Sequence, residues 1–522
     1  TRLKEHKNEM SEDDEDVLPS LRKSLKSKYS PHEMKLVPQV QNYNLDDFNH
    51  LMNGIALRKA SASKHPYYAQ RKIARCYNYF LKRIDKEIES LNDESVVDFL
   101  LGKYNKVKQA MLVKIEVSSH SDAYVLFESL NNRGTPLTAI DLMKNLIMAK
   151  AEGNNLTIDD CFNRWQTLLG NLSEDYSIQE RFFRQYYNAF KHRLNEPFQS
   201  DADRKKDPLG VVATRSNLLN IFESLINKDL PSFLDDILQC GQIYSWLILQ
   251  DTIENPYRKA LEDLDHIQGA PSYLLLMYLM RNKEELAVSE EQINLIIRLL
   301  AKYFVRRNIT DYPNTRDLTR IFMDIISKLE EAQATGGKVV SIIIDILSTP
   351  TNCASDEQFR RSLEGDVYKD NVGATRYILC KLAEAAMTQE TWTDLWRRTD
   401  KKVFVWTIEH IFPEGQNIPE SWVNMIANGD KELAKKYLEE YTHKIGNLTI
   451  TGYNSTLGNK SFEEKRDRKS KDGQRFIGYK NGLDINREIA TMDKWTVDDI
   501  KTRTVTLVDD LMKVYKFPGQ QQ

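Results

Sequence analysis

The sequence has little cysteine, no long apolar run and almost no net charge. Its five cysteines are scattered over 522 residues without a C-x-x-C pair, which argues against a disulfide framework and a cysteine zinc site and fits a reducing cytoplasm. The longest apolar stretches, such as YLLLMYLM at 273–280, are far too short to span a membrane. With a net charge of −3, any binding to nucleic acid must come from a local basic patch.

The length predicts several domains, because 522 residues exceed what one hydrophobic core supports. The Pro/Ser/Asn-rich stretch at 348–357 is the best candidate for a boundary. We expect a first domain over 1–150, a helical region over 151–350 and a third domain over 351–522. The helical region is predicted from segments such as INLIIRLLAKYFVRR, whose apolar residues recur every three to four positions.

The first 150 residues predict mixed structure. QAMLVKIEV at 109–117 is typical of a strand, and DAYVLFESL at 122–130 of a helix. AIDLMKNLIMAK at 139–150 predicts an amphipathic helix, and a last helix is expected near 496–516. The fold class is therefore mainly α with small α/β parts.

The segment TIEHIFPEG, residues 407–415, places a carboxylate and an imidazole side by side at the end of a β-prone run. A second short strand, GNLTIT at 446–451, follows downstream, and Asn454 stands where a helix begins. This strand–strand–helix order, with His410 at the end of the first strand, is typical of the ββα-metal unit of HNH nucleases.

The residue types suit phosphodiester hydrolysis. His410 has the near-neutral pKa that a general base needs. Glu409 and the amide oxygen of Asn454 are hard ligands for Mg²⁺ or Mn²⁺, which neutralise charge on the leaving oxygen. Neighbours in a strand point to opposite faces, so Glu409 and His410 can share a site only if the backbone turns, as Pro413 permits.

A plainer interpretation stands beside this one. A lone E-H-x-x-P is more often a strand end with a satisfied surface histidine, and Asn447 in a Gly-Asn pair is more often turn chemistry. The segment 458–480 adds eight basic residues against four acidic ones. Such a run is usually a solvated face, but here it follows the predicted metal helix, where a phosphate backbone would lie.

These residues resemble the C-terminal nuclease domain of the GmrSD family, modification-dependent (type IV) restriction endonucleases of bacterial phage defence. The family patterns (D/E)-H-I-x-P, G-N-L-T-L and N-S-x-x-x-N-x-x-F-x-x-K are met at 409–413, 446–450 and 454–465. The resemblance implies a Mg-dependent HNH endonuclease acting on double-stranded, modified DNA. The roles it implies are a base (His410), a loop-orienting residue counted with it as catalytic (Asn447), metal ligands (Glu409, Asn454) and DNA contacts (Lys460, Lys465, Arg466, Arg468).

The resemblance extends to the N-terminal part. FESLNNRGTPLTAIDLMKN at 127–145 is similar to the signature of the family's ParB-like N-terminal domain. It makes Asn131, Arg133, Gly134 and Asp141 candidates for a nucleotide or DNA-sensing site. The alternative is a structural turn, with Asp141 as a helix-start residue.

One element of the family pattern, D-G-Q-Q-R, associated with nucleotide binding and hydrolysis, is not found in this sequence. We therefore expect a partial ParB-like domain, completed by residues before Thr1 or by a partner chain. The 109–117 strand should then lie at an unfinished sheet edge. GTP or ATP turnover should be weak until that lobe is restored.

Two other functions remain open from the sequence. One is a nucleic-acid-binding regulator whose nuclease fold is catalytically idle, and the other is an RNA-directed HNH nuclease. A homo-oligomer is also compatible with the sequence, a membrane partner is not expected, and the expected location is the cytoplasm.

Overall fold

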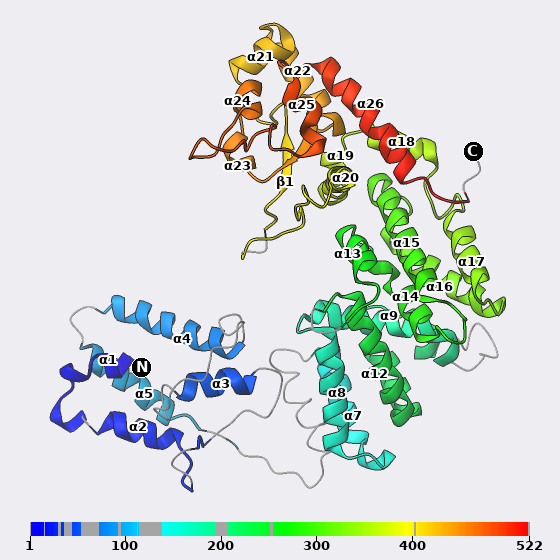
Figure 1. Cartoon of the computed structure of the whole chain (residues 1–522). Helices are drawn as coiled ribbons and strands as arrows, with labels where there is room; N and C mark the ends of the chain where they lie inside the picture. The colour runs from blue at the N-terminus through cyan, green and yellow to red at the C-terminus, as the bar shows by residue number, and fades with distance from the viewer. Residues whose placement is uncertain are drawn as a thin grey trace. The chain divides into compact units, whose positions relative to one another are not determined.

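The computed structural model describes residues 2–14, 16–29, 33–35, 44–53, 72–91, 95–111, 113, 138–194, 207–250, 254–400 and 403–519. They belong to two compact units, residues 1–170 and 171–522, which are described separately (Figure 1). Most described residues are helical, which confirms the predicted mainly α composition. No helix in these ranges is long and apolar enough to cross a membrane.

The first unit has a small helical core. Leu3, Val97 and Leu100 are buried together, and Ile84 and Ile88 pack against them. The helices are α1 (Arg2–Glu5), α2 (Val17–Leu25), α3 (Asn44–Met52), α4 (Lys72–Glu89), α5 (Val96–Lys108), α7 (Ala139–Lys150) and most of α8 (Ile158–Leu172). Helix α7 confirms the prediction for 139–150.

The predicted strand at 109–117 does not begin where the sequence suggests. Helix α5 runs to Lys108 and is capped at Gln109, and residues 109–111 are not in a strand. Residues 112 and 114–137 lie outside the described residues. The predicted helix at 122–130 lies there as well.

The second unit begins with a helical region built around one fully buried helix. Helix α14 carries the apolar run noted in the sequence, and each residue from Tyr273 to Met280 is buried. It contacts helices on several sides, which explains why it has no polar face. The helices of this region are α9 (Tyr176–Leu194), α11 (Leu218–Lys228), α12 (Leu230–Leu247), α13 (Arg258–His266), α14 (Tyr273–Arg281), α15 (Glu290–Thr310), α16 (Thr315–Glu331) and α17 (Gly337–Leu347).

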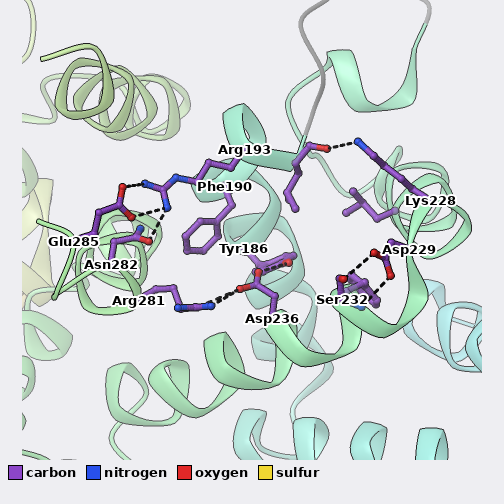
Figure 2. A pocket seen from close by; sticks show the side chains of 13 residues that line it. Tyr186, Phe190, Arg193, Lys228, Asp229, Ser232, Asp236, Arg281, Asn282 and Glu285 are labelled. Carbon is purple, nitrogen blue, oxygen red and sulfur yellow. Dashed lines mark hydrogen bonds and ion pairs between the residues drawn. The ribbon is translucent and has the colours of Figure 1, made fainter. Parts of the chain in front are cut away.

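A cavity of about 470 Å³ opens in this helical region, between α9, α11, α12 and the end of α14 (Figure 2). Its charged groups neutralise one another. Arg193 pairs with Glu285 at 3.0 Å, and Arg281 pairs with Asp236 at 3.1 Å. Tyr186 donates a hydrogen bond of 2.7 Å to the same Asp236 carboxylate. None of the residues singled out in the sequence lines this cavity, so the candidate site lies elsewhere.

The C-terminal part of the second unit contains the short strands. Strands β1 (Thr407–His410) and β2 (Leu448–Thr451) pair antiparallel, with His410 opposite Leu448. Within the described ranges, these two strands make up a two-stranded sheet. The helices around them are α18 (Asp356–Leu363), α19 (Val367–Asp370), α20 (Val372–Ala385), α21 (Glu420–Ala427), α22 (Lys431–Tyr441), α23 (Asn454–Leu457), α24 (Phe462–Arg466), α25 (Arg487–Thr491) and α26 (Val497–Val514).

Arg306 on α15 ties the helical region to this C-terminal part. Its side chain is fully buried and pairs with Asp356 at 2.7 Å. Its guanidinium donates to the carbonyl oxygens of Ala354 and Tyr515, at 2.8 and 3.4 Å. It also lies over the ring of Phe359 at 4.7 Å. One side chain therefore joins α15, the start of α18 and the end of the chain.

Candidate functional site

The segment 407–415 forms strand β1, as the sequence predicts, and then bends at Ile411 and Phe412. Beyond the strand, the Ile411 amide still donates to the carbonyl oxygen of Asn447 at 2.9 Å. Ile411 and Phe412 then enter the hydrophobic core and are fully buried. These contacts hold the end of β1 against the residues that precede β2. His410 is therefore presented from a fixed backbone.

His410 has a buried ring between two aromatic neighbours. The residue is 7% exposed, and its ring lies edge-on against Tyr368, with centroids 4.5 Å apart. The ring of His443 is 5.5 Å away. Burial, together with the charges of His443 and Lys465, lowers the pKa of His410 to about 3. The imidazole is therefore neutral at pH 7, and no hydrogen-bond partner among the described residues reaches its buried Nε2.

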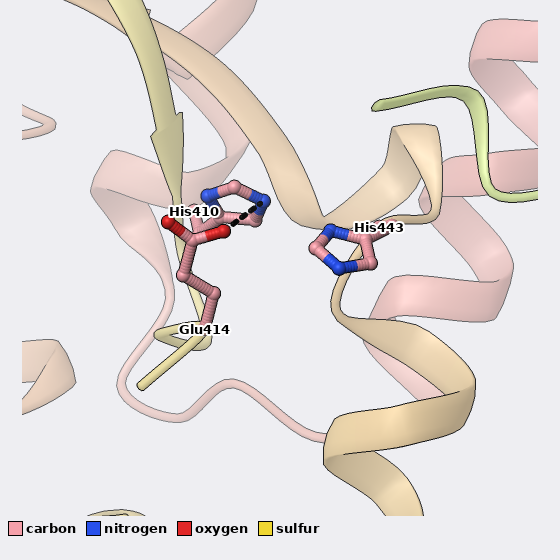
Figure 3. Close-up of side chains that lie close together, drawn as sticks. All are labelled: His410, Glu414 and His443. Carbon is pink, nitrogen blue, oxygen red and sulfur yellow. Dashed lines mark ion pairs between the residues drawn. The ribbon is translucent and has the colours of Figure 1, made fainter. Parts of the chain in front are cut away.

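Glu414 and His443 face the same nitrogen (Figure 3). The carboxylate Oε2 of Glu414 lies 3.7 Å from Nε2 of His410. One ligand atom from each of the three residues lies within 4.8 Å of the others. The sequence analysis missed both partners. Glu414 stands four residues after His410, beyond Pro413, and that short spacing is the signal that could have found it.

Glu409 faces a different partner from the one that the sequence predicts. Its Oε1 lies 2.7 Å from Nζ of Lys465, between side chains that are 3% and 1% exposed. Burial raises the pKa of Glu409, and the Lys465 ammonium opposes part of that rise. The same Nζ donates to the carbonyl oxygens of His410 and Ile411, at 2.8 and 3.2 Å. In this structure the Glu409 carboxylate is therefore engaged by an ammonium, and its role as a metal ligand stays a prediction.

Asn454 stands at the first position of α23, as expected. Its Nδ2 donates to the carbonyl oxygen of Ile408 at 2.7 Å. This bond fastens the start of the helix to β1, so strand, strand and helix meet within a few residues. The structure thus brings Asn454 to the strand that carries His410.

Asn447 is fully buried and all of its side chain is used in hydrogen bonds. Its Oδ1 accepts from the Phe412 amide at 2.8 Å and from Nε1 of Trp495 at 3.2 Å. Its Nδ2 donates to the carbonyl oxygens of Phe412 and Thr442, at 2.9 and 3.0 Å. Asn447 therefore clamps the loop after His410, and no atom of its side chain is left to touch a substrate.

The four predicted DNA contacts differ in exposure. Lys465 is fully buried and pairs with Glu409, so its ammonium is not on the surface in this structure. Arg466 is 14% exposed and pairs with Asp467 and Asp493 at 2.6 and 3.0 Å. Lys460 is 38% exposed beside Glu464, and Arg468 is half-buried.

The exposed cations lie a few residues later, on a hairpin-like turn. A bridge joins Lys469 to Phe476, and Phe476 is 41% exposed. Lys469 and Lys480 lie over its ring at 5.1 and 5.7 Å. Lys471 and Arg475 are exposed between them. We call residues 468–480 the basic hairpin.

Three of the N-terminal candidates, namely Asn131, Arg133 and Gly134, lie outside the described residues. The fourth, Asp141, forms a capping box at the start of α7. Its Oδ2 accepts from the Thr138 hydroxyl at 2.7 Å and from the Thr138 amide at 3.2 Å. The structure thus gives Asp141 the helix-start role that was the alternative.

The residues around Glu409 do not fit a divalent cation held by that carboxylate. A Mg²⁺ ion there would have to displace the Lys465 ammonium, whose three oxygen neighbours are Glu409, His410 and Ile411. Like charges so close together in a buried position repel strongly. In this structure the Lys465 ammonium therefore occupies the position that a metal ion at Glu409 would need.

Comparison with known families gives two matches. Residues 4–148 match the model described as GmrSD restriction endonuclease, N-terminal domain. Residues 353–510 match the model described as GmrSD restriction endonucleases, C-terminal domain. Together they cover more than half of the chain. A search of curated proteins finds no match.

Proposed function

Because the chain belongs to the GmrSD restriction endonuclease family, we propose that it is an HNH-type DNA endonuclease in which His410 accepts the proton of the attacking water. The proposed substrate is double-stranded DNA, modified as in phage genomes. The family membership supports restriction of DNA. The HNH chemistry and the modified substrate are our proposals.

The single observation that carries this proposal is the state of His410. Its imidazole is neutral, and its Nε2 has no hydrogen-bond partner among the described residues. A general base must be unprotonated and within reach of a water molecule. A pKa of about 3 makes a weak base, but a bound DNA phosphate would raise that pKa by favouring the imidazolium.

Asn447 supports the reaction by holding the backbone next to His410. It holds the backbone of Phe412 on both sides, through the amide and the carbonyl. His410 is two residues before that clamp, so its ring position depends on it. We propose that Asn447 is a positioning residue that keeps His410 in place.

The basic hairpin supports contact with DNA. Lys469, Lys471 and Arg475 are exposed cations, which attract the phosphate backbone. The ring of Phe476 lies beneath Lys469 and Lys480, so it helps to hold these cations at the surface. We propose that this hairpin, rather than Lys465, contacts the nucleic acid.

We also propose that DNA cleavage depends on Mg²⁺ or Mn²⁺, without assigning Glu409 as a ligand of that ion. Cleavage should stop in EDTA and return on addition of the ion. Stimulation by GTP or ATP through the N-terminal domain is proposed in the same way and is checked by adding each nucleotide to the cleavage assay.

The decisive experiment replaces His410 with alanine. Losing a general base should slow cleavage by about a hundredfold or more, while DNA binding stays within about twofold, because the base contributes to chemistry and not to affinity. His192→Ala, in the helical region, is the matched control and should cleave normally. Cleavage and binding of modified and unmodified DNA are measured side by side.

A second function is favoured by one observation, the ion pair that occupies the carboxylate of Glu409. If Glu409, the predicted metal ligand, stays neutralised in this way, the nuclease fold would be catalytically idle. The chain would then be a nucleic-acid-binding regulator. Full activity of His410→Ala, or a wild-type chain that binds DNA without cleaving it, would favour the regulator.

A further inference from the structure

We propose that His410, Glu414 and His443 form a binding site for a divalent transition-metal ion of the zinc type. The site differs from the oxygen-ligand pair, Glu409 and Asn454, that the family resemblance implies for magnesium. It draws on two residues that the sequence analysis did not select.

The three side chains already surround a common point (Figure 3). Nε2 of His410 and Oε2 of Glu414 are 3.7 Å apart, and all three ligand atoms lie within 4.8 Å of one another. Ligand atoms on one tetrahedral zinc ion are about 3.4 Å apart. Glu414 is 54% exposed and lies outside any helix or strand, so its carboxylate can move towards the two imidazoles.

Two unused nitrogen atoms point to a ligand. Nε2 of His410 and Nδ1 of His443 are both buried and have no hydrogen-bond partner among the described residues. Buried polar atoms are normally satisfied, so two such imidazole atoms in neighbouring rings call for an explanation. A bound metal ion would give Nε2 of His410 a partner. It would also explain why the ring of His443 lies so close to that of His410.

Tyr368 sets the orientation of both rings. It meets His410 edge-on, with an interplanar angle of 79°, and stacks on His443 at 11°. The Tyr368 amide also approaches the carbonyl oxygen of His443, at 3.5 Å. Helix α19, which carries Tyr368, thus fixes two ligands before any ion binds, which lowers the cost of assembling the site.

The donor set selects the class of ion. Two imidazoles and one carboxylate suit zinc, cobalt or nickel, whereas magnesium prefers oxygen ligands and keeps several waters. Three protein ligands leave a fourth position for water. Lys465, whose charge also acts on His410, is neutralised by Glu409 at 2.7 Å, so it does not bar a cation.

Binding would remove His410 from catalysis, because a nitrogen that ligates a metal cannot accept a proton. A zinc-type ion should therefore inhibit DNA cleavage, and a chelator selective for that ion should reverse the inhibition. This consequence rests on the proposed role of His410 in cleavage, whereas binding of the ion does not.

The test titrates the full chain with Co²⁺, followed by visible absorption, and with Zn²⁺, followed by calorimetry. We expect one ion per chain and a cobalt spectrum without thiolate charge-transfer bands, which would instead indicate cysteine ligands. Glu414→Gln and His443→Gln should each weaken binding at least tenfold. Glu439→Gln, an exposed carboxylate on α22, and His192→Gln are the matched controls and should bind as the wild type does.

The outcomes separate the two proposals. No binding by the wild-type chain, thiolate bands in the cobalt spectrum, or binding that both Glu414→Gln and His443→Gln leave unchanged would overturn the metal site. Binding that depends on these residues but does not inhibit cleavage in Mg²⁺ would keep the site and overturn the role of His410 as base. The side chain of Glu414 is 54% exposed, so its variant should fold normally.

Discussion

Lys465 and Glu409 form an ion pair of 2.7 Å between side chains that are 1% and 3% exposed. The pair joins α24 to the end of β1, since the same ammonium also donates to the carbonyl oxygens of His410 and Ile411. Two buried charges hold together only because each compensates the other. Both residues match the family pattern, and the structure assigns them a role in holding the strand end.

Replacing Lys465 with methionine should destabilise the chain by about 3–5 kcal/mol, because it leaves the Glu409 carboxylate buried and uncompensated. The double variant Glu409→Leu/Lys465→Met should recover most of that loss. Lys460→Met is the matched control, since Lys460 makes an exposed pair with Glu464 at 3.5 Å and should cost less than about 1 kcal/mol. Urea unfolding measures all three. A loss below about 1 kcal/mol for Lys465→Met, the range of an exposed pair, would mean that the pair is not closed in solution.

Asn447→Ala should cost about 3 kcal/mol or more, since it leaves the buried amide and carbonyl of Phe412 without partners. Cleavage should fall as well, because the loop that carries His410 loses its clamp. Asn459→Ala removes an exposed asparagine of the C-terminal part and should change neither quantity. Thermal unfolding and single-turnover cleavage are the measurements. A stable and fully active Asn447→Ala chain would show that the clamp is dispensable.

The pH dependence of cleavage follows from the state of His410. Its pKa in the free protein is about 3, so it is already neutral at pH 5 and above. The value of kcat/KM, which reports the free enzyme, should therefore show no ionisation of this base between pH 5 and 8. The value of kcat should show a higher pKa, because bound phosphate favours the imidazolium. A fall in kcat/KM centred near the ordinary histidine pKa of about 6.5 that His410→Ala removes would contradict the buried state.

Because His266 is held neutral by burial, we expect the free energy of unfolding to fall in acid. Its ring stacks on Trp396 with centroids 3.7 Å apart, and burial lowers its pKa to about 4. A lowered pKa gives stability that is complete above the unfolded value of about 6.5 and is lost as the pH falls towards 4. His266→Phe keeps the stacking but cannot be protonated. The variant should therefore avoid about 2 kcal/mol of the loss in unfolding free energy that the wild type suffers in acid, a figure reduced to allow for partial exposure of the ring.

Urea unfolding at pH 7 and pH 4.5 tests the contribution of His266. The variant should match the wild type at pH 7 and exceed it at pH 4.5. Equal acid sensitivity of the two chains would show that His266 is not held neutral.

The basic hairpin predicts the salt dependence of DNA binding. Replacing Lys469, Lys471 and Arg475 by alanine should weaken binding and reduce the slope of log K against log salt by about 0.9 for each phosphate that the hairpin no longer neutralises. The matched control is the triple alanine variant of three exposed lysines on α22, namely Lys431, Lys435 and Lys436. Fluorescence anisotropy at several salt concentrations measures both. An unchanged slope in the hairpin variant would place the DNA elsewhere.

The motif could be recognised from sequence because it is local. The strand ending in His410, the strand after Asn447 and the helix starting at Asn454 are all where the pattern predicts them. Helices such as α14 were also predictable, since a run of apolar residues must be buried. Membership of the family, inferred from these motifs, is confirmed by the family models.

The side-chain partners were not predictable, because they depend on which face of β1 each residue occupies. Alternation along a strand separates Glu409 from His410, and the sequence cannot say that Lys465 lies on one side and His443 on the other. Tyr368 gave no signal at all, since α19 is four residues long and distant in sequence from the motif. Long-range packing decides these contacts.

The contacts of Arg306 decide where the chain can be cut without loss of stability. Its guanidinium lies among Ala354, Asp356, Phe359 and Tyr515, all of which belong to the C-terminal part. Cutting the chain near residue 350 would remove the cation from these groups and expose the ring of Phe359, which is now fully buried. An excised fragment carrying the His410 motif should therefore be less stable than its hydrophobic core suggests, and a boundary placed before α15 should yield the sturdier protein.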